Sequence, residues 1–191
     1  FLNAEQNASL RGFTLTNGTG YIANDEHTRG GGVLIRNTYM TGSSISLTNC
    51  EITGNYAGLG AGISSTNASL CLSGLNIHHN YSLAQGGGIH IVGASTIVPN
   101  IVFDPVNRCS LYENYGAAPV DVSIVDIPAN LTIYLGKASI NPPSTFYIGR
   151  HNNIPSLQQY HDTVIAEQAH RNEINRDFYV SPNGDDNNSG I

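Results

Sequence analysis

Three passages of the chain repeat one pattern, in which a glycine cluster and an aliphatic strand precede a second short strand and an aliphatic-x-x-Asn motif. The passages run over residues 30–55, 60–80 and 86–114. A repeat of this length cannot bury a core alone, so successive repeats have to stack on one another. The pattern therefore predicts an all-β solenoid built of short strands.

Residues at equivalent positions of the repeats are expected to form columns through the stack. The predicted columns are Asn55, Asn80 and Asn114 at a bend, where their amides can stack as a ladder, and Cys50, Leu75 and Cys109 facing the interior. Stacked strands lie about 4.8 Å apart. Cysteines two repeats apart are then too distant for a disulfide, so we interpret both as small buried apolar residues.

Alternation of apolar and polar residues at period two predicts further inward-facing ladders. One ladder is Leu15, Ile52, Ile77 and Leu111, with Phe13 above the cysteine column; the other consists of the pairs Ile45 and Leu47, Leu70 and Leu72, Ile101 and Phe103, and Leu131 and Ile133. Asn17 breaks the asparagine register by one residue. Differences in repeat length are assigned to loops, chiefly 19–29 and 104–108.

The repeat pattern weakens after Leu135, and Pro142-Pro143 interrupts any strand there because proline cannot donate to a ladder. Residues 156–172 then fit a short capping helix that begins with a Ser156–Gln159 capping box, although residues 163–165 fit a strand equally well. The sequence thus predicts β-helix coils over 1–136, a non-solenoid end segment over 137–177 and a tail over 178–191.

The alternation of Gly-Gly-(Gly/Ala)-aliphatic with aliphatic-x-x-Asn resembles the repeats of right-handed parallel β-helix surface proteins. It is similar to the GGA(I/V/L) and FxxN repeats of chlamydial-type polymorphic outer membrane proteins, with Ile52, Ile77 and Leu111 in place of Phe. The resemblance covers about residues 8–136. Residues 178–186 resemble a segment that commonly opens such β-helices. The resemblance implies a right-handed parallel β-helix, a cell-surface location, and a role in adhesion or assembly.

Composition excludes some classes of partner. Only 12% of the 191 residues are charged, the net charge is −6, and the 8 Lys and Arg do not cluster, which argues against nucleic acid. No apolar run approaches the roughly 20 residues of a transmembrane helix. The chain starts at Phe1 without Met, which we interpret as a mature product or an excised fragment.

Catalytic candidates are sparse. Asp104, Asp121 and Asp126, with Arg108 nearby in sequence, are the acids that a carbohydrate-active β-helix would use. We interpret them as solvated turn residues and predict no catalytic site. His78, His79 and His90 show neither metal spacing nor a triad order, and His90 is expected on the outer face between Ile89 and Ile91.

Two further motifs are candidate ligand or modification sites. Asp185, Asn187 and Ser189 match the opening of a calcium loop, but the distal acid is missing, so a polar turn is the favoured interpretation. Among the N-x-Ser/Thr sequons, Asn7, Asn67 and Asn130 are the better glycosylation candidates, because they lie near turns before strands. An inward position of Asn80 would oppose its modification.

These features favour a non-enzymatic extracellular structural or adhesive protein without a cofactor, apart from the candidate calcium loop. Self-association is the expected interaction, as a filament or surface-layer subunit joined head-to-tail through the solenoid ends and the C-terminal tail. Surface glycans and proteins of a host or neighbouring cell are the other expected partners. The alternative is a carbohydrate-binding or polysaccharide-degrading β-helix protein.

Overall fold

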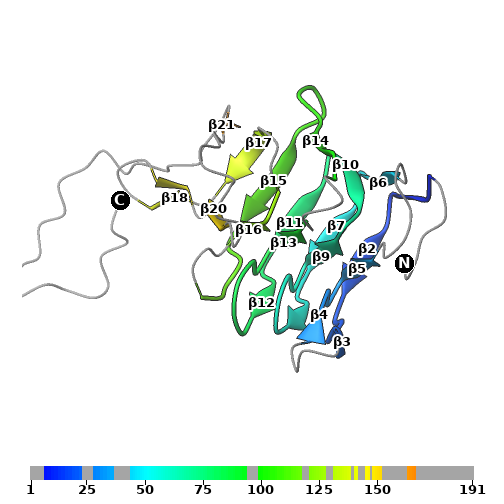
Figure 1. Cartoon of the computed structure of the whole chain (residues 1–191), viewed down its shortest axis with the longest axis vertical. Coiled ribbons are helices and arrows are strands. Elements are labelled where there is room, and N and C mark those ends of the chain that lie inside the picture. The colour runs from blue at the N-terminus through cyan, green and yellow to red at the C-terminus, as the bar shows by residue number, and fades with distance from the viewer. Residues whose placement is uncertain are drawn as a thin grey trace, which may run out of the picture.

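The computed structural model describes residues 7–22, 28–36, 44–93, 99–117, 121–127, 131–138, 140–141, 145–146, 148–151 and 163–166. Within these residues the protein is built of strands, and no helix occurs among them. The strands gather into three parallel sheets whose members lie side by side (Figure 1). The all-β class predicted from the sequence is confirmed, and the arrangement is compatible with a parallel β-helix.

The three sheets have four, six and five strands. The four-stranded sheet contains β1 (Ser9–Arg11), β6 (Ser44–Thr48), β10 (Ser69–Ser73) and β14 (Ile101–Phe103). The six-stranded sheet contains β2 (Thr14–Thr16), β7 (Glu51–Thr53), β11 (Asn76–His78), β15 (Cys109–Tyr112), β17 (Thr132–Ala138) and β21 (Thr163–Ala166). The five-stranded sheet contains β5 (Val33–Arg36), β9 (Ile63–Thr66), β13 (Ile89–Val92), β16 (Val122–Val125) and β20 (Ile148–His151).

Three strand pairs complete the described structure. The parallel pair is β8 (Tyr56–Ala57) with β12 (Tyr81–Ser82). The antiparallel pairs are β3 (Tyr21–Ile22) with β4 (Thr28–Arg29), and β18 (Ile140–Asn141) with β19 (Thr145–Phe146).

The chain visits the three large sheets in a fixed order. It passes through the five-, four- and six-stranded sheets as β5–β6–β7, again as β9–β10–β11, and again as β13–β14–β15. Each strand therefore pairs in parallel with its equivalent one repeat away. This order is the stacking that the three sequence repeats predicted.

Strand register places equivalent apolar residues one above another. Leu15, Ile52, Ile77 and Leu111 align across the six-stranded sheet, and Ile45, Leu70 and Ile101 align across the four-stranded sheet, as do Leu47, Leu72 and Phe103. Except for the half-buried Leu15, these side chains are buried in one continuous cluster. The alternation read from the sequence thus identified the core.

The fourth apolar pair joins the same core as predicted, and β17 lies close to β14, but its backbone pairing differs from the prediction. Leu131 and Ile133 are buried, but β17, which carries Ile133, pairs with β15 in the six-stranded sheet and not with β14. The register of β15 against β17 shifts between Cys109 and Ser110, so this pairing is irregular. Among the described strands, β17 follows β16 directly, and it takes the place in the six-stranded sheet that β7, β11 and β15 hold in the earlier repeats.

The bends between strands contain columns of residues with left-handed backbone conformation. One column directly follows strands of the six-stranded sheet and consists of Asn17, Gly54, His79 and Glu113, with φ of 59°, 64°, 53° and 52°. Most L-residues avoid this conformation, although Asn and His tolerate it better than most. The recurrence of the same turn in four repeats shows that the bend is imposed by the fold.

The glycine clusters allow the repeats to approach closely. A Cβ atom on Gly62 would lie 2.4 Å from the carbonyl oxygen of Gly88, and one on Gly88 would lie 2.6 Å from that of Asp121. No side chain fits at such a distance. These glycines are therefore required by stacking and not only by the turn.

The parallel sheets continue beyond residue 136, where we placed the last coil. β20 pairs with β16, and β21 pairs with β17. Thr163–Ala166 form β21, so the strand alternative holds for these four residues of the predicted helix 156–172. The other residues of that helix, and the tail 178–191, lie outside the described residues.

Among the residues that the structure describes, no helix is long and apolar enough to cross a membrane.

Candidate functional site

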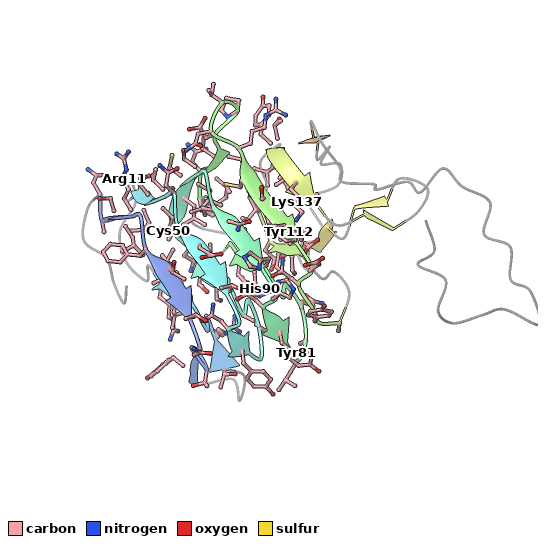
Figure 2. All side chains as sticks on the ribbon, turned by 180° about the vertical axis from the view of Figure 1, so that it is seen from behind. Arg11, Cys50, Tyr81, His90, Tyr112 and Lys137 are labelled. Atoms are coloured by element: carbon pink, nitrogen blue, oxygen red, sulfur yellow. The ribbon has the colours of Figure 1, made fainter. Side chains whose placement is uncertain are left out.

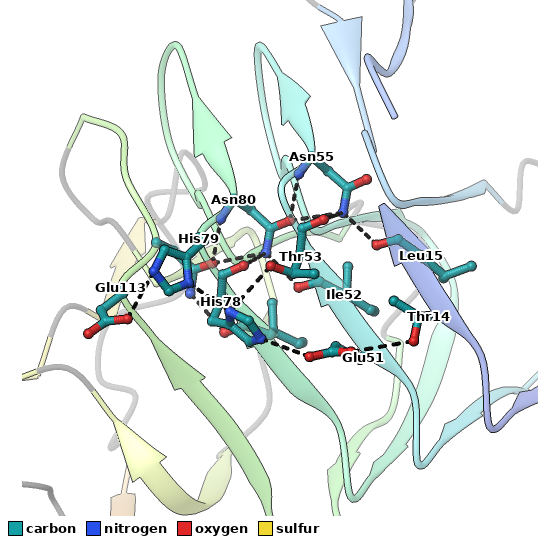
Figure 3. Close-up of polar contacts among 12 residues, drawn as sticks. Thr14, Leu15, Glu51, Ile52, Thr53, Asn55, His78, His79, Asn80 and Glu113 are labelled. Carbon is teal, nitrogen blue, oxygen red and sulfur yellow. Dashed lines mark hydrogen bonds and ion pairs between the residues drawn. The ribbon is translucent and has the colours of Figure 1, made fainter. Parts of the chain in front are cut away.

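An amide ladder runs through the interior at the end of the six-stranded sheet (Figure 3). Asn80 Oδ1 accepts hydrogen bonds from the backbone N–H of Asn55 at 3.1 Å and from Asn55 Nδ2 at 2.9 Å. Asn114 Oδ1 accepts the equivalent pair from Asn80 at 3.2 and 3.0 Å. The three side chains are buried. The asparagine column named from spacing is thus brought together as a hydrogen-bonded row.

Each amide in the ladder also ties the preceding repeat to its own. The Nδ2 groups of Asn55, Asn80 and Asn114 donate to the carbonyl oxygens of Leu15, Ile52 and Ile77 at 3.0, 2.8 and 3.1 Å. Buried backbone carbonyls need such partners. The ladder therefore provides hydrogen-bond donors for backbone carbonyl groups at the bend that would otherwise be buried without this partner.

The two ends of the ladder differ chemically. At one end, the N–H of Gly18 donates to Asn55 Oδ1 at 3.0 Å, so Gly18 takes the place of an asparagine and Asn17 lies one residue out of register. At the other end, Asn114 Nδ2 donates to Asp121 Oδ1 at 2.8 Å. Asp121 is buried and occupies the position that Gly62 and Gly88 hold in earlier repeats. Its carbonyl accepts the N–H of Ile89, just as the carbonyl of Gly88 accepts the N–H of Ile63.

The cysteine column faces the interior. Cys50, Leu75 and Cys109 are buried, with exposed fractions of 2, 1 and 0%, and none of the three cysteines forms a disulfide. Burial raises the pKa of Cys109 to about 12. Cys71 is half-buried and pairs in register with Ser46 and Val102.

The opposite face of the six-stranded sheet carries a row of polar and aromatic side chains. Thr53, His78 and Tyr112 lie in register on β7, β11 and β15. The rings of His78 and Tyr112 stack with centroids 5.0 Å apart and an interplanar angle of 10°. Lys137 Nζ lies 3.4 Å from the centroid of Tyr112, and both residues are labelled in Figure 2.

His78 of this row, together with Glu51, His79 and Glu113, forms what we call the histidine–glutamate cluster (Figure 3). His78 Nε2 lies 3.2 Å from Glu51 Oε1, and His79 Nε2 lies 3.1 Å from Glu113 Oε2. The two Nδ1 atoms lie 2.7 Å apart. The cluster is thus a linear chain of carboxylate, imidazole, imidazole and carboxylate.

Three exposed tyrosines form a column, and each comes three residues after the end of a strand of the six-stranded sheet. Tyr56 and Tyr81 pair in register on β8 and β12, and their rings stack at 5.6 Å and 4°. Tyr115 continues the column through a bridge to Tyr81. These side chains are 41, 50 and 52% exposed. The column presents a regular aromatic edge to solvent, and its middle member Tyr81 is labelled in Figure 2.

The acids considered for catalysis are not brought together. Asp104 accepts hydrogen bonds from the backbone N–H of Val106 and Asn107 and from the Ser73 hydroxyl, whereas Asp121 receives Asn114 of the ladder. Val106, Ser73 and Asn107, in that order of effect, lower the pKa of Asp104. Asp126 is in a left-handed turn. Arg108 Nε donates to the carbonyl of Pro105 at 2.9 Å, and the guanidinium lies 5.7 Å from the Tyr134 ring.

His90 lies on the face of β13 opposite to the inward Ile89 and Ile91, but that face is covered and not open to solvent. Its side chain is 4% exposed, although it alternates with the inward Ile89 and Ile91. The turns at Gly60 and Gly86 lie against its Cβ, at 2.9 and 3.0 Å from a Cβ placed on either glycine. The glycine turns therefore cover a face that period two alone would leave open.

The sequon and calcium candidates are only partly within the described structure. Asn7 is exposed, Asn67 is half-buried, and both have left-handed backbone conformation. Asn80 is 0% exposed and its Nδ2 is occupied in the ladder. Asn130, and the calcium-loop residues Asp185, Asn187 and Ser189, lie outside the described residues.

Sequence reasoning missed the histidine–glutamate cluster, but the repeat contains the necessary signal. Aligning the passages on their asparagines places His78 between Thr53 and Tyr112, and His79 between Gly54 and Glu113. The alignment does not give side-chain direction at a left-handed residue such as His79. Only the structure shows that His79 turns toward His78.

No protein-family model, curated protein or solved structure matches the chain. Among the described residues, no group of three or more His, Cys, Asp or Glu is arranged to hold one metal ion.

Proposed function

We propose that the three sheets close into a right-handed parallel β-helix, and that the protein is a non-enzymatic, extracellular structural or adhesive element. The observation that carries the proposal is the outer face of the six-stranded sheet, where side chains such as Thr53, His78 and Tyr112 stand in register. A regular face of this kind offers repeated contacts to a partner of matching periodicity.

Head-to-tail self-association is the specific form that we favour. Among the described strands, β1, β2 and β5 are the outermost members of their sheets at one end of the stack. Edge strands expose backbone N–H and C=O groups that pair readily with another strand. The half-buried Leu10 and Leu15 add apolar surface at this end. A second copy stacked at this end would cover the edge strands and this apolar surface.

Electron microscopy of the intact protein across a concentration range tests this proposal. We expect fibres or sheets that Leu10→Lys abolishes, because the substitution places a charge on the edge strand β1. Val106→Lys is the matched control, since Val106 is 91% exposed in a loop. Circular dichroism has to show that both variants remain folded. Isolated short rods at every concentration would contradict self-association.

Carbohydrate binding is the second candidate, favoured by the tyrosine column of Tyr56, Tyr81 and Tyr115. Exposed aromatic rings provide apolar faces with a polar hydroxyl at the tip. Glycan-array screening tests it, with Tyr81→Ser expected to weaken any binding. Polysaccharide turnover by the unmodified protein would instead indicate an enzyme. Asp121→Ala is a poor probe of catalysis, because Asp121 is buried at the end of the amide ladder.

A further inference from the structure

The Nδ1 atoms of His78 and His79 face each other at an unusual distance. They lie 2.7 Å apart, while the ring centroids are 5.0 Å apart and the rings are nearly perpendicular, at 83°. The centroid separation exceeds the nitrogen separation by roughly the two ring radii, so the nitrogens point toward each other. At this distance the two nitrogens share either a proton, donated by one Nδ1 to the other, or a different cation.

The far sides of both rings are held by carboxylates. His78 Nε2 lies 3.2 Å from Glu51, and His79 Nε2 lies 3.1 Å from Glu113. A carboxylate on one ring nitrogen fixes a proton there and leaves the other nitrogen as a metal ligand. Carboxylate–imidazole pairs of this kind orient histidines in metal sites. Here the carboxylates leave the two Nδ1 atoms facing each other, with Thr53 Oγ1 also 3.2 Å from that of His78.

We propose that His78 and His79 bind one imidazole-preferring transition-metal ion, copper or zinc, through their Nδ1 atoms. Two protein ligands leave the remaining coordination positions to water or to a partner molecule. Copper is expected to bind more tightly than zinc, following the general order of divalent-metal affinities. The site requires no assumption about self-assembly or adhesion.

A small movement of His79 admits the ion. Metal–imidazole bonds of about 2.0–2.1 Å place two nitrogens of a tetrahedral site about 3.3 Å apart, which is wider than the 2.7 Å observed. His78 is held by the stacked Tyr112 ring and by Thr53 Oγ1, 3.2 Å from its Nδ1, and its side chain is only 14% exposed. The side chain of His79 is 52% exposed, so it is free to turn outward.

Titration of the untagged full chain with Cu²⁺, followed by electron paramagnetic resonance, and with Zn²⁺, followed by calorimetry, tests the proposal. We expect one ion per chain with nitrogen hyperfine coupling in the copper spectrum. His78→Gln and His79→Gln should each lower the affinity at least tenfold. His27→Gln is the matched control because it removes one of the other histidines, and it should leave the affinity unchanged.

The carboxylates provide a second, milder test. Glu51→Gln and Glu113→Gln should each weaken binding by roughly 10- to 100-fold while the circular dichroism spectrum stays unchanged. Loss of binding in His27→Gln, or equal affinity in both histidine variants and the unmodified chain, would place the ion elsewhere and overturn the proposal. Absence of binding to both metals would also overturn it, leaving a shared proton between the two Nδ1 atoms.

Discussion

At the scale of single residues, the amide ladder shows why the repeats end in asparagine. An asparagine side chain accepts with Oδ1 and donates twice with Nδ2, and Asn80 uses all of these capacities. Aspartate cannot donate and leucine can do neither. The position is therefore chemically specific even though it lies in the core.

Replacing Asn80 by Ala is expected to destabilise the protein by about 4 kcal/mol. The substitution leaves the N–H of Asn55 and the carbonyl of Ile52 buried without these partners, and each such group costs about 1–3 kcal/mol. Urea unfolding followed by circular dichroism measures the change. Asn100→Ala is the control, because Asn100 is exposed, and it should stay within about 0.5 kcal/mol. An equal effect of both would contradict the role of the ladder.

Cys109 predicts a dependence of stability on alkaline pH. Its pKa rises from 9.0 to about 12 on folding because burial disfavours the thiolate. The stabilisation is complete below pH 9 and is lost as pH rises through 9 toward 12, by about 1.4 kcal/mol per pH unit. Unfolding free energies measured from pH 8 to 11 should fall more steeply for the unmodified protein than for Cys109→Ala. Parallel curves would show that the thiol does not contribute.

At the scale of elements, stacking depends on bends that repeat in the same place. Period two and the glycine clusters were enough to predict the strands and the columns of the core, because each inward position is fixed by the pleat. They were not enough for His90, which the turns at Gly60 and Gly86 cover, or for Leu131 and Ile133, because β17 joins the six-stranded sheet. Those outcomes depend on contacts between repeats that a single-repeat template does not contain.

Gly12 and Gly18 are needed for different reasons, one for its backbone conformation and the other for lack of space around it. Gly12 has φ of 74° and open space around it, whereas a Cβ on Gly18 would lie 1.8 Å from the carbonyl oxygen of Gly31. Gly12→Ala should cost about 1–2 kcal/mol from the left-handed backbone alone. Gly18→Ala should cost at least twice as much, because a backbone segment has to move. Thermal unfolding of both variants provides the comparison, and equal costs would be inconsistent with the close approach at Gly18.

At the scale of the whole molecule, each repeat is supported by its neighbours along one direction. Strand β11 pairs with β7 on one side and β15 on the other, whereas β2 pairs with β7 alone among the described strands. In stacked repeats, stability approximates a sum of repeat and nearest-neighbour contributions. The ends should therefore open before the middle.

Hydrogen exchange followed by mass spectrometry should reveal this gradient. We expect the amides of β11 to exchange most slowly and those of β2 much faster, because local opening requires breaking fewer contacts at the edge. If the protein forms head-to-tail assemblies, β2 should become protected as concentration rises. Uniform exchange across the repeats at all concentrations would indicate a single cooperative unit instead.

The row of amides also has a direction. Every Nδ2 donates toward the next repeat, from Asn55 to Asn80, from Asn80 to Asn114, and from Asn114 to Asp121. The amide dipoles therefore add along the stack, and their positive end meets a buried aspartate. A backbone N–H fills the opposite end. The row thus begins at a backbone N–H and ends at a carboxylate, so the repeats are not interchangeable. In a shuffled order of the same repeats, the buried carboxylate of Asp121 would lie beside a group other than the amide of Asn114.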